Sequence, residues 1–277
     1  MWSPNPPYID IDIPVGTYRK RFVIPEKWND REIILHFGSI TGYAQIYLNG
    51  EKVGMTKASK TPAEFNITKY IKKGENLLAV QVYRWHDGSY LEDQDFWRLS
   101  GIERDVFLQA YPKLTIWDFY LKPDLDTNYK NGEFRATVDL REFEGNKIKQ
   151  GSVRLDLYDN NKLVMSRQRA FEMKDSATTL SFNGHVKNVR KWSAETPFLY
   201  DCIITLLDND KKQIAVTAYK TGFRKIEIKN AQLMVNGVPT YIKGVNRHEH
   251  NDTLGHVQTR EMMMHDLKLL KQFNFNA

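Results

Sequence analysis

The sequence has a single cysteine among its 277 residues, Cys202. One cysteine cannot form an internal disulfide, which excludes the disulfide-stapled scaffolds of small secreted domains. Because Cys202 lies in the strand-like run 199–204, we expect a buried structural thiol rather than a nucleophile. The sequence also lacks an apolar run of membrane-spanning length and an N-terminal signal peptide. We therefore expect a soluble chain, with the cytoplasm and the periplasm both left open.

A concentrated stretch of positive charge is missing too, although the formal net charge is +6 and the pI is about 9.1. The basic residues occur as short pairs such as Lys72-Lys73 and Lys211-Lys212. The densest group, 19–21, would place alternate side chains on opposite faces of a strand. This pattern indicates a solvated surface rather than a phosphate-binding stripe, so we expect neither nucleic acid nor a membrane as a partner.

What the sequence does contain is enough apolar material for real cores. Hydrophobic residues make up 41%, aromatic residues 12% and charged residues 27%, a composition typical of globular rather than disordered chains. The length allows one large domain or two to three of ordinary size. Short strand-like runs separated by turn signals favour several β-rich domains.

Residues 15–111 show the strand and turn pattern of a β-sandwich. The pair Asn49-Gly50 readily adopts the positive φ angles of a type I′ hairpin turn. In the first strand, Tyr18, Phe22 and Ile24 alternate with charged residues, which predicts one buried face. The expected strands are 15–25, the hairpin 44–53, 77–85 and 105–111.

Between the last two of these strands lie about 20 residues with little periodicity, and connections that long are usually functional or disordered. Residues 92–106 (EDQDFWRLSGIERDV) combine carboxylates, an amide, aromatic rings and arginines. Carboxylates and amides can bind paired sugar hydroxyls, while the faces of Phe96 and Trp97 can pack on the C–H face of a pyranose. The alternative is a solvated surface loop, since such loops collect charged residues in any case.

A second β-sandwich of about 110 residues is predicted from Leu114 onward. Turn clusters at 159–161 and 208–210 are typical of hairpin tips. We expect Trp192 and Tyr200 to cover one end of this sandwich without any chemistry. The expected strands are 134–140, 152–158, 180–186, 203–207 and 213–219.

After residue 221 the pattern changes to a hairpin at Asn236-Gly237, a buried-type strand at 241–245 and a polar loop at 246–252. A helix is predicted to begin near Thr259 as its N-cap, with Glu261 in the first turn and Met263, Leu267 and Leu270 at helical spacing. Strand, polar loop and helix form a βα unit, whose loop is where TIM-barrel chemistry is placed. A barrel needs about 250 residues, so we expect only its beginning here.

Residues 92–106, 191–200, 244–250 (GVNRHEH) and 272–277 (QFNFNA) resemble segments of the β-galactosidases of glycoside hydrolase family 2. The resemblance covers essentially the whole chain in the family's domain order. It implies a galactose-binding-like jelly-roll sandwich at 1–112, an immunoglobulin-like sandwich at 113–223 and an incomplete TIM barrel at 224–277. The implied function is the N-terminal part of a retaining glycoside hydrolase that cleaves terminal β-D-galactosides.

The resemblance also implies where the chemistry lies. The family's two catalytic glutamates sit on later barrel strands, and neither of their motifs occurs here. We therefore expect both beyond Ala277 and the chain to be inactive alone. Asp95 matches the aspartate that contacts the galactose 6-hydroxyl and a sodium ion, His248 matches a histidine that stabilises the reacting sugar, and Trp97 is a further candidate contact. The family uses magnesium and sodium ions, and we expect no complete site for either ion in this chain. Members of the family are expected to form homo-oligomers.

Several alternatives stay open at this point. His248 could be a hydrogen-bonded histidine at a domain interface, or it could join Glu249, His250 and His256 in a transition-metal site. The chain could also be a noncatalytic carbohydrate-binding or assembly module built from two sandwiches. Two departures from the family pattern stand out: Glu103 replaces the usual aromatic residue, and the family's opening segment does not precede residues 5–7.

Overall fold

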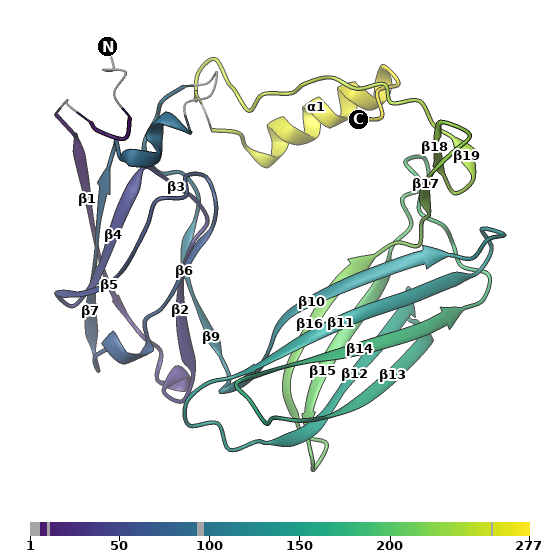
Figure 1. The fold of residues 1–277 in the computed structure, drawn as a ribbon, viewed down its shortest axis with the longest axis horizontal. Helices are drawn as coiled ribbons and strands as arrows, with labels where there is room; N and C mark the ends of the chain where they lie inside the picture. Colours follow the sequence, from purple (N-terminus) through teal and green to yellow (C-terminus); the bar gives the residue numbers. More distant parts are fainter. Residues whose placement is uncertain (1–5, 10–11, 93–96, 256) are drawn as a thin grey trace. The chain divides into compact units, whose positions relative to one another are not determined.

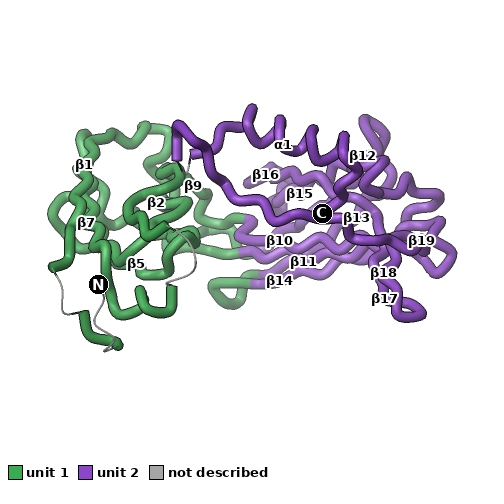
Figure 2. Tube along the Cα trace, turned by 90° about the horizontal axis from the view of Figure 1, so that it is seen from above, with its two compact units in different colours: residues 1–115, 141–149, 173–177 green, residues 116–140, 150–172, 178–277 purple. Residues whose placement is uncertain are grey.

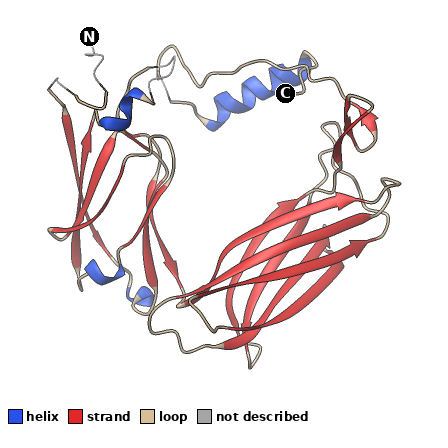
Figure 3. Cartoon of the chain, in the orientation of Figure 1, coloured by secondary structure: helices blue, strands red, loops and turns tan. Residues whose placement is uncertain are grey.

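The computed structural model describes residues 6–9, 12–92, 97–255 and 257–277. Strands dominate these residues, and their one α-helix lies near residue 277 (Figure 1 and Figure 3). This confirms the mainly β fold predicted from the sequence. The chain divides into two compact units, drawn in green and purple in Figure 2. Unit 1 comprises residues 1–115, 141–149 and 173–177, and unit 2 comprises residues 116–140, 150–172 and 178–277.

Unit 1 contains the sandwich predicted for residues 15–111. Its sheets have the strand orders β1-β7-β4-β5 and β6-β2-β9, and β3 pairs with β8 in a short separate ladder. All of these pairings are antiparallel. The strands are β1 (Val15–Val23), β2 (Glu32–Phe37), β3 (Ile40–Thr41), β4 (Tyr43–Leu48), β5 (Glu51–Thr56), β6 (Ala63–Asn66), β7 (Glu75–Tyr83), β8 (Gly101–Ile102) and β9 (Val106–Tyr111). Short 3-10 turns are η1 (Glu26–Trp28), η2 (Thr68–Tyr70) and η3 (Asp87–Tyr90).

The β4–β5 hairpin forms as its sequence predicts. Alternate residues of β4 are buried, because successive side chains of a strand point to opposite faces. At the tip, Asn49 and Gly50 have φ angles of 55° and 89°, as a type I′ turn requires. The side chain of Asn49 also donates to the backbone carbonyl of Tyr70 at 2.9 Å, which ties the tip to η2.

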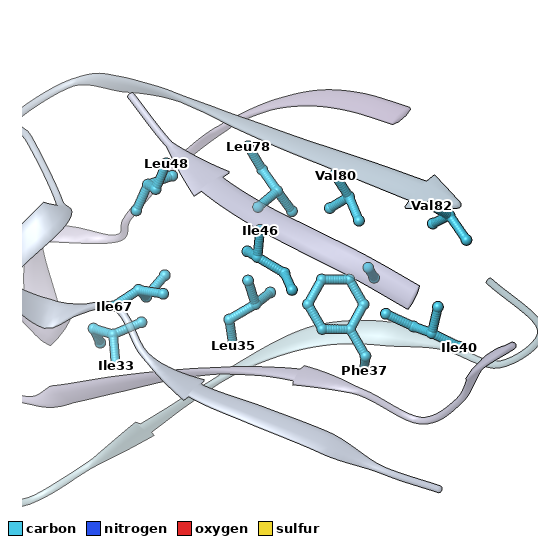
Figure 4. Packing of buried hydrophobic residues seen from close by; sticks show 11 residues of the cluster. Ile33, Leu35, Phe37, Ile40, Ile46, Leu48, Ile67, Leu78, Val80 and Val82 are labelled. Atoms are coloured by element: carbon cyan, nitrogen blue, oxygen red, sulfur yellow. The ribbon is translucent and has the colours of Figure 1, made fainter. Parts of the chain in front are cut away.

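The core of unit 1 lies between its two sheets, and Figure 4 shows the side chains of β7 and β4 pointing toward those of β2. Each member of this cluster is at most 8% exposed. Burying one such side chain contributes about 1.5–3 kcal/mol, so the cluster is the main source of stability for this unit. The labelled residues are Ile33, Leu35, Phe37, Ile40, Ile46, Leu48, Ile67, Leu78, Val80 and Val82.

The first strand is less buried than predicted. Phe22 and Ile24 pack against the core, but Tyr18 is 44% exposed. β1 is an edge strand whose only ladder in the described chain is with β7, so its outer residues meet solvent. The prediction of one continuously buried face is therefore wrong at Tyr18.

Unit 2 contains the second predicted sandwich. Its sheets have the immunoglobulin-like strand orders β10-β11-β14 and β13-β12-β15-β16. All pairings of the second sheet are antiparallel. Cys202 is fully buried there, and burial together with the nearby Asp156 carboxylate raises the pKa of its thiol to about 12. The predicted structural role of this cysteine is confirmed. The strands are β10 (Leu114–Leu125), β11 (Gly132–Glu142), β12 (Gln150–Asp159), β13 (Lys162–Glu172), β14 (Ala177–Val186), β15 (Tyr200–Asp208) and β16 (Gln213–Thr221).

Beyond this sandwich follow the short strands β17 (Ile226–Lys229), β18 (Gln232–Val235) and β19 (Val238–Pro239), which form one antiparallel sheet. The turn between β18 and β19 is the predicted one, with Asn236 and Gly237 at φ angles of 53° and 78°. The buried strand predicted at 241–245 is not observed. Tyr241 and Ile242 are 79% and 69% exposed, and the segment is a loop.

The helix α1 (Arg260–Gln272) begins where the sequence predicts. The hydroxyl oxygen of Thr259 accepts a hydrogen bond from the backbone N–H of Met262 at 3.3 Å, the expected N-cap contact. The backbone N–H of Glu261 and the Thr259 hydroxyl hold the pKa of the Glu261 carboxyl below its usual range. The apolar face of the helix is open, since Met263 is 38% and Leu267 52% exposed.

Candidate functional site

The sugar-recognition segment predicted at 92–106 lies in unit 1, between η3 and β9. Asp95, its principal candidate for sugar and sodium contact, lies outside the described residues. Trp97 is described and is 50% exposed, so part of its ring is open to a ligand. The guanidinium of Arg84, on the strand side of the segment, donates to the carbonyl oxygen of Arg98 at 3.1 Å. The aromatic candidate is therefore held close to the sandwich while still accessible.

The approach to this segment is held by a capping box at the N-terminal end of η3. The buried ring of His86 accepts a hydrogen bond from the N–H of Gly88, and Ser89 Oγ accepts one from the N–H of His86. A hydrogen bond from Lys57 is the main contact that holds the pKa of the Asp87 carboxyl below its usual range. These contacts fix the direction in which the chain enters the segment.

The segment ends in the β3–β8 ladder, where Gly101 pairs with Thr41. Gly101 has a φ of 132°, a conformation that side chains rarely adopt, which accounts for glycine here. Two carboxylates that the sequence analysis did not select, Glu92 and Glu103, lie at the two ends of the segment and bond to hydroxyl groups of the sandwich. The only signal for Glu103 was its departure from the family pattern.

The second predicted segment, 246–252, lies in unit 2 before α1. His248 and Glu249 are exposed. Arg247, which the sequence analysis did not select, fixes the loop: its Nε donates to Asp266 Oδ2 of α1 at 2.9 Å, and its guanidinium also reaches Gln258 Oε1 at 3.3 Å. Trp97 belongs to unit 1 and His248 to unit 2.

The βα unit around this loop contains the beginning of a parallel pairing. The backbone N–H of Asn276 donates to the carbonyl of Lys243 at 2.9 Å, and the N–H of Val245 donates to the carbonyl of Ala277 at 3.3 Å. Both segments run in the same direction, as neighbouring barrel strands do. A fully formed strand also needs a longer ladder than these contacts supply, which explains why 241–245 is a loop.

A metal cluster is not seen at the second loop. Within the described part of the chain, which does not include His256, no group of three His, Cys, Asp or Glu side chains is placed to hold a metal ion. Because His256 lies outside the described residues, the four-residue metal site stays an untested alternative. None of the described helices has the length and apolar character needed to cross a bilayer.

Unit 2 also has an open groove of about 560 Å³ away from these motifs. Its lining includes Trp192, over whose ring the guanidinium of Arg224 lies at 4.7 Å from the centroid. Lys220 on its rim pairs with Asp201 at 2.6 Å. Tyr200 beside it is buried, and its hydroxyl oxygen accepts a hydrogen bond from the N–H of Arg190 at 2.8 Å. The aromatic residues predicted to cover the sandwich end thus have structural contacts.

Three sequence profiles of one family match successive parts of the chain. The profile described as "Glycosyl hydrolases family 2, sugar binding domain" matches residues 3–112. The profile "Glycosyl hydrolases family 2" matches residues 114–224, and "Glycosyl hydrolases family 2, TIM barrel domain" matches residues 226–277. The first two profiles fall on the two sandwiches and the third on the segment that contains the βα unit.

Curated relatives match along almost the whole chain. The "Beta-galactosidase" of Photobacterium profundum is 41% identical over 280 residues, which cover 99% of this chain and 27% of the relative. The "Beta-galactosidase" of Priestia megaterium is 41% identical over 268 residues, covering 95% of this chain and 26% of the relative. The chain therefore spans about a quarter of the length of these relatives.

Solved structures share the fold. The crystal structure of the Bacteroides uniformis β-glucuronidase superposes with a TM-score of 0.84 at 24% identity, covering 96% of this chain and 33% of that one. The likeness extends over the sandwiches and the βα segment in the same order. Because the profiles, the relatives and the fold agree along the described sequence, the chain belongs to glycoside hydrolase family 2.

Proposed function

We propose that this chain is the N-terminal part of a retaining β-galactosidase that hydrolyses terminal β-D-galactosides. The observation that carries the proposal is the 41% identity, over 99% of the chain, to a relative named a β-galactosidase. That match includes the sugar-recognition segment 92–106, whose residue types suit a pyranose. The proposed domains are 1–112, 113–223 and 224–277.

The division of labour follows from retaining chemistry. One carboxyl group protonates the leaving oxygen while a second, about 5 Å away, attacks the sugar and is later released by water. In the family these groups belong to later barrel strands, so this chain supplies binding rather than bond cleavage. We assign the galactose 6-hydroxyl to Asp95, the sugar's C–H face to Trp97 and support of the reacting sugar to His248.

Metal ions enter this proposal only in part. Asp95 would offer sodium one hard oxygen ligand, which suits that cation. Magnesium is also implied by the family resemblance, but we assign it no ligand among the described residues, which form no cluster of three suitable side chains. A homo-oligomeric complete enzyme stays a prediction, which light scattering of that enzyme would test.

The alternative of a noncatalytic carbohydrate-binding module is not favoured. The TIM-barrel profile matches residues 226–277, and relatives that match 95% and 99% of the chain are named as enzymes. A module made only of two sandwiches would leave this segment without a role.

The test is turnover by an enzyme in which this chain continues into a complete barrel. Aryl β-galactosides, β-glucuronides and β-mannosides are compared as substrates, with the 277-residue chain assayed alongside. We expect the extended enzyme to prefer the galactoside and the chain alone to be inactive. Preference for the glucuronide would contradict the substrate assignment. Turnover by the chain alone would mean that a competent carboxylate pair lies within it.

Asp95→Asn tests the sugar-binding assignment in the extended enzyme. Loss of a charged hydrogen-bond acceptor should lower kcat/KM for the galactoside by about tenfold to a hundredfold. Asp210→Asn is the matched control, because Asp210 lies at the exposed tip between β15 and β16. Equal activity of the two variants would remove Asp95 from the site.

A further inference from the structure

Glu92, at the start of the sugar-recognition segment, is bonded to the sandwich through Ser59. One carboxylate oxygen accepts the Ser59 backbone N–H at 3.1 Å, and the other accepts the Ser59 hydroxyl at 2.6 Å. Behind this pair lies the buried ring of His86, with Nε2 at 3.4 Å from the Glu92 carboxylate. Two hydrogen bonds from Ser59 thus hold the carboxylate where the segment begins.

Glu103 has the same kind of contacts where the segment ends. Its carboxylate accepts the hydroxyl of the fully buried Ser39 at 3.1 Å and that of Thr41 at 2.8 Å. Its backbone N–H donates to the carbonyl of Ser39 at 3.2 Å. Three hydrogen bonds therefore connect this one residue to the start of β3.

The two anchoring points are also connected to each other. The hydroxyl oxygen of Ser59, which binds Glu92, accepts a hydrogen bond from the N–H of Gly42 at 3.0 Å. The N–H of Lys60 donates to the carbonyl of Ile40 at 3.2 Å. Glu92 and Glu103 are consequently held by one continuous network that includes β3, next to the core residue Ile40.

We propose that Glu92 and Glu103 form a carboxylate clamp that fixes the two ends of the sugar-recognition segment. The proposal rests on the proposed function and assigns both residues as positioning residues, not as groups that touch the sugar. Because the clamp fixes the two ends of the segment, part of the segment's conformational entropy is lost when the protein folds. Less entropy is then lost when the sugar binds. Trp97 then meets the ligand from a segment whose two ends are already fixed.

Carboxylates suit this role because an ionised acceptor forms shorter and stronger bonds to hydroxyl and N–H donors than a neutral one. The positions of the donors also call for a side chain with two acceptor oxygen atoms. Each clamp residue has two donors that reach different oxygen atoms of its carboxylate, and glutamine offers only one acceptor oxygen. Glutamine should therefore weaken either end.

The first test measures backbone hydrogen exchange in the 277-residue chain, so it does not depend on catalysis. Thr41→Val and Ser59→Ala each remove one hydroxyl of the clamp with little change in volume. We expect exchange in residues 97–103 to rise at least about fivefold in both. Thr41→Ser keeps a hydroxyl and should restore the slow exchange.

Thr179→Val is the matched control. Thr179 donates its hydroxyl to Asp139 at 2.6 Å on an exposed face of unit 2, so this variant removes the same type of bond elsewhere. It should leave exchange at 97–103 unchanged. Unchanged exchange in Thr41→Val and Ser59→Ala would overturn the clamp. If Ser59→Ala fails to fold, Glu92→Gln supplies the second comparison at the same end of the segment.

The second test uses the enzyme extended through its barrel. A positioning role predicts that Thr41→Val raises KM for an aryl β-galactoside about tenfold while kcat stays within about twofold, and that Thr41→Ser recovers the original KM. An equal fall in kcat for Thr41→Val and Thr179→Val would indicate lost folded enzyme and overturn the positioning role. An extended enzyme without galactosidase activity would contradict the proposed function alone, since the exchange test would still decide the clamp.

Discussion

The two segments proposed to meet the sugar are 92–106 and 246–252, the second taken with the loop that follows it to 258, and they are held by different kinds of contact. The first is joined at both ends to the sandwich of unit 1 through Glu92, Glu103 and the β3–β8 ladder. The second is exposed in most of its residues, and its described bonds run to α1 or within the loop, as in the Asn251–Gly255 bridge. One segment is supported by a core, the other by local contacts.

This difference indicates where each segment gets its shape. The segment in unit 1 depends on strands that contribute to the buried cluster around Phe37, so a change there should affect the unfolding of the whole unit. The segment in unit 2 should respond locally, because its anchor Arg247 pairs with an exposed Asp266. Substitutions of the same type, one at the support of the first segment and one in the loop of the second, can therefore measure the contrast.

Gly42→Ala should have the largest effect. Gly42 has a φ of 106°, and a Cβ atom there would lie 2.4 Å from the backbone carbonyl oxygen of Tyr83. Backbone strain and overpacking together should lower the free energy of unfolding of unit 1 by about 2–5 kcal/mol. Urea denaturation followed by peptide-resolved hydrogen exchange would measure this value for unit 1 separately from unit 2.

Gly255→Ala is the corresponding change in the second segment. Gly255 also has a positive φ, 67°, but a Cβ atom added there would have no neighbouring atom within 4 Å. Only the left-handed backbone is then unfavourable, which costs about 1 kcal/mol. Equal losses for the two alanine variants would contradict the contrast between a core-supported and a locally supported segment.

The stability of unit 1 should also depend on pH, through a carboxylate of β2. Burial alone would raise the pKa of Glu32 in β2, but hydrogen bonds from Lys113, Asn66 and Thr68 outweigh it and lower the pKa below the ordinary 4.5. A lowered folded pKa means that the stabilisation is complete above pH 4.5 and is lost as the pH falls through the folded value. Unit 1 should therefore lose stability in acid.

Glu32→Gln measures this contribution. It leaves the partly buried Lys113 without its charged partner, so unit 1 should lose about 1–3 kcal/mol at pH 7 and show a flatter pH dependence below 4.5. Glu261→Gln at the start of α1 is the control, since that carboxyl is fully exposed and should change the acid unfolding of unit 1 little. Denaturation curves between pH 3 and 7 would show no difference if Glu32 were unimportant.

The parts of the fold that the sequence predicted well have local causes. The Asn-Gly turns at 49–50 and 236–237 and the Thr259 N-cap depend on residues next to one another in the chain. Strand β13 was missed because most of its residues are exposed and show no apolar alternation, as expected of a strand at the edge of its sheet. Position in a sheet cannot be read from such a segment alone.

Short motifs were enough to select candidate site residues, but they did not reveal which residues hold the segment in place. Trp97 and His248 could be selected from short patterns, whereas the partners of the clamp are far apart in the sequence. Ser59 and Glu92 are separated by 33 positions, and Thr41 and Glu103 by 62. The same limit explains the incorrect strand at 241–245, because its apolar residues form a strand only with a neighbouring strand to complete the ladder.

Arg247→Ala should have the smallest effect on stability and the most local one. It removes the bond to Asp266 and the contact to Gln258, both of which are exposed, so the free energy of unfolding should change by about 0–1 kcal/mol. Exchange in residues 247–258 should nevertheless rise, because Arg247 joins this loop to α1. Lys268→Ala, which removes a positive charge from α1, should leave the exchange of residues 247–258 unchanged. A loss as large as that of Gly42→Ala would mean that the second segment, too, is built on a cooperative core.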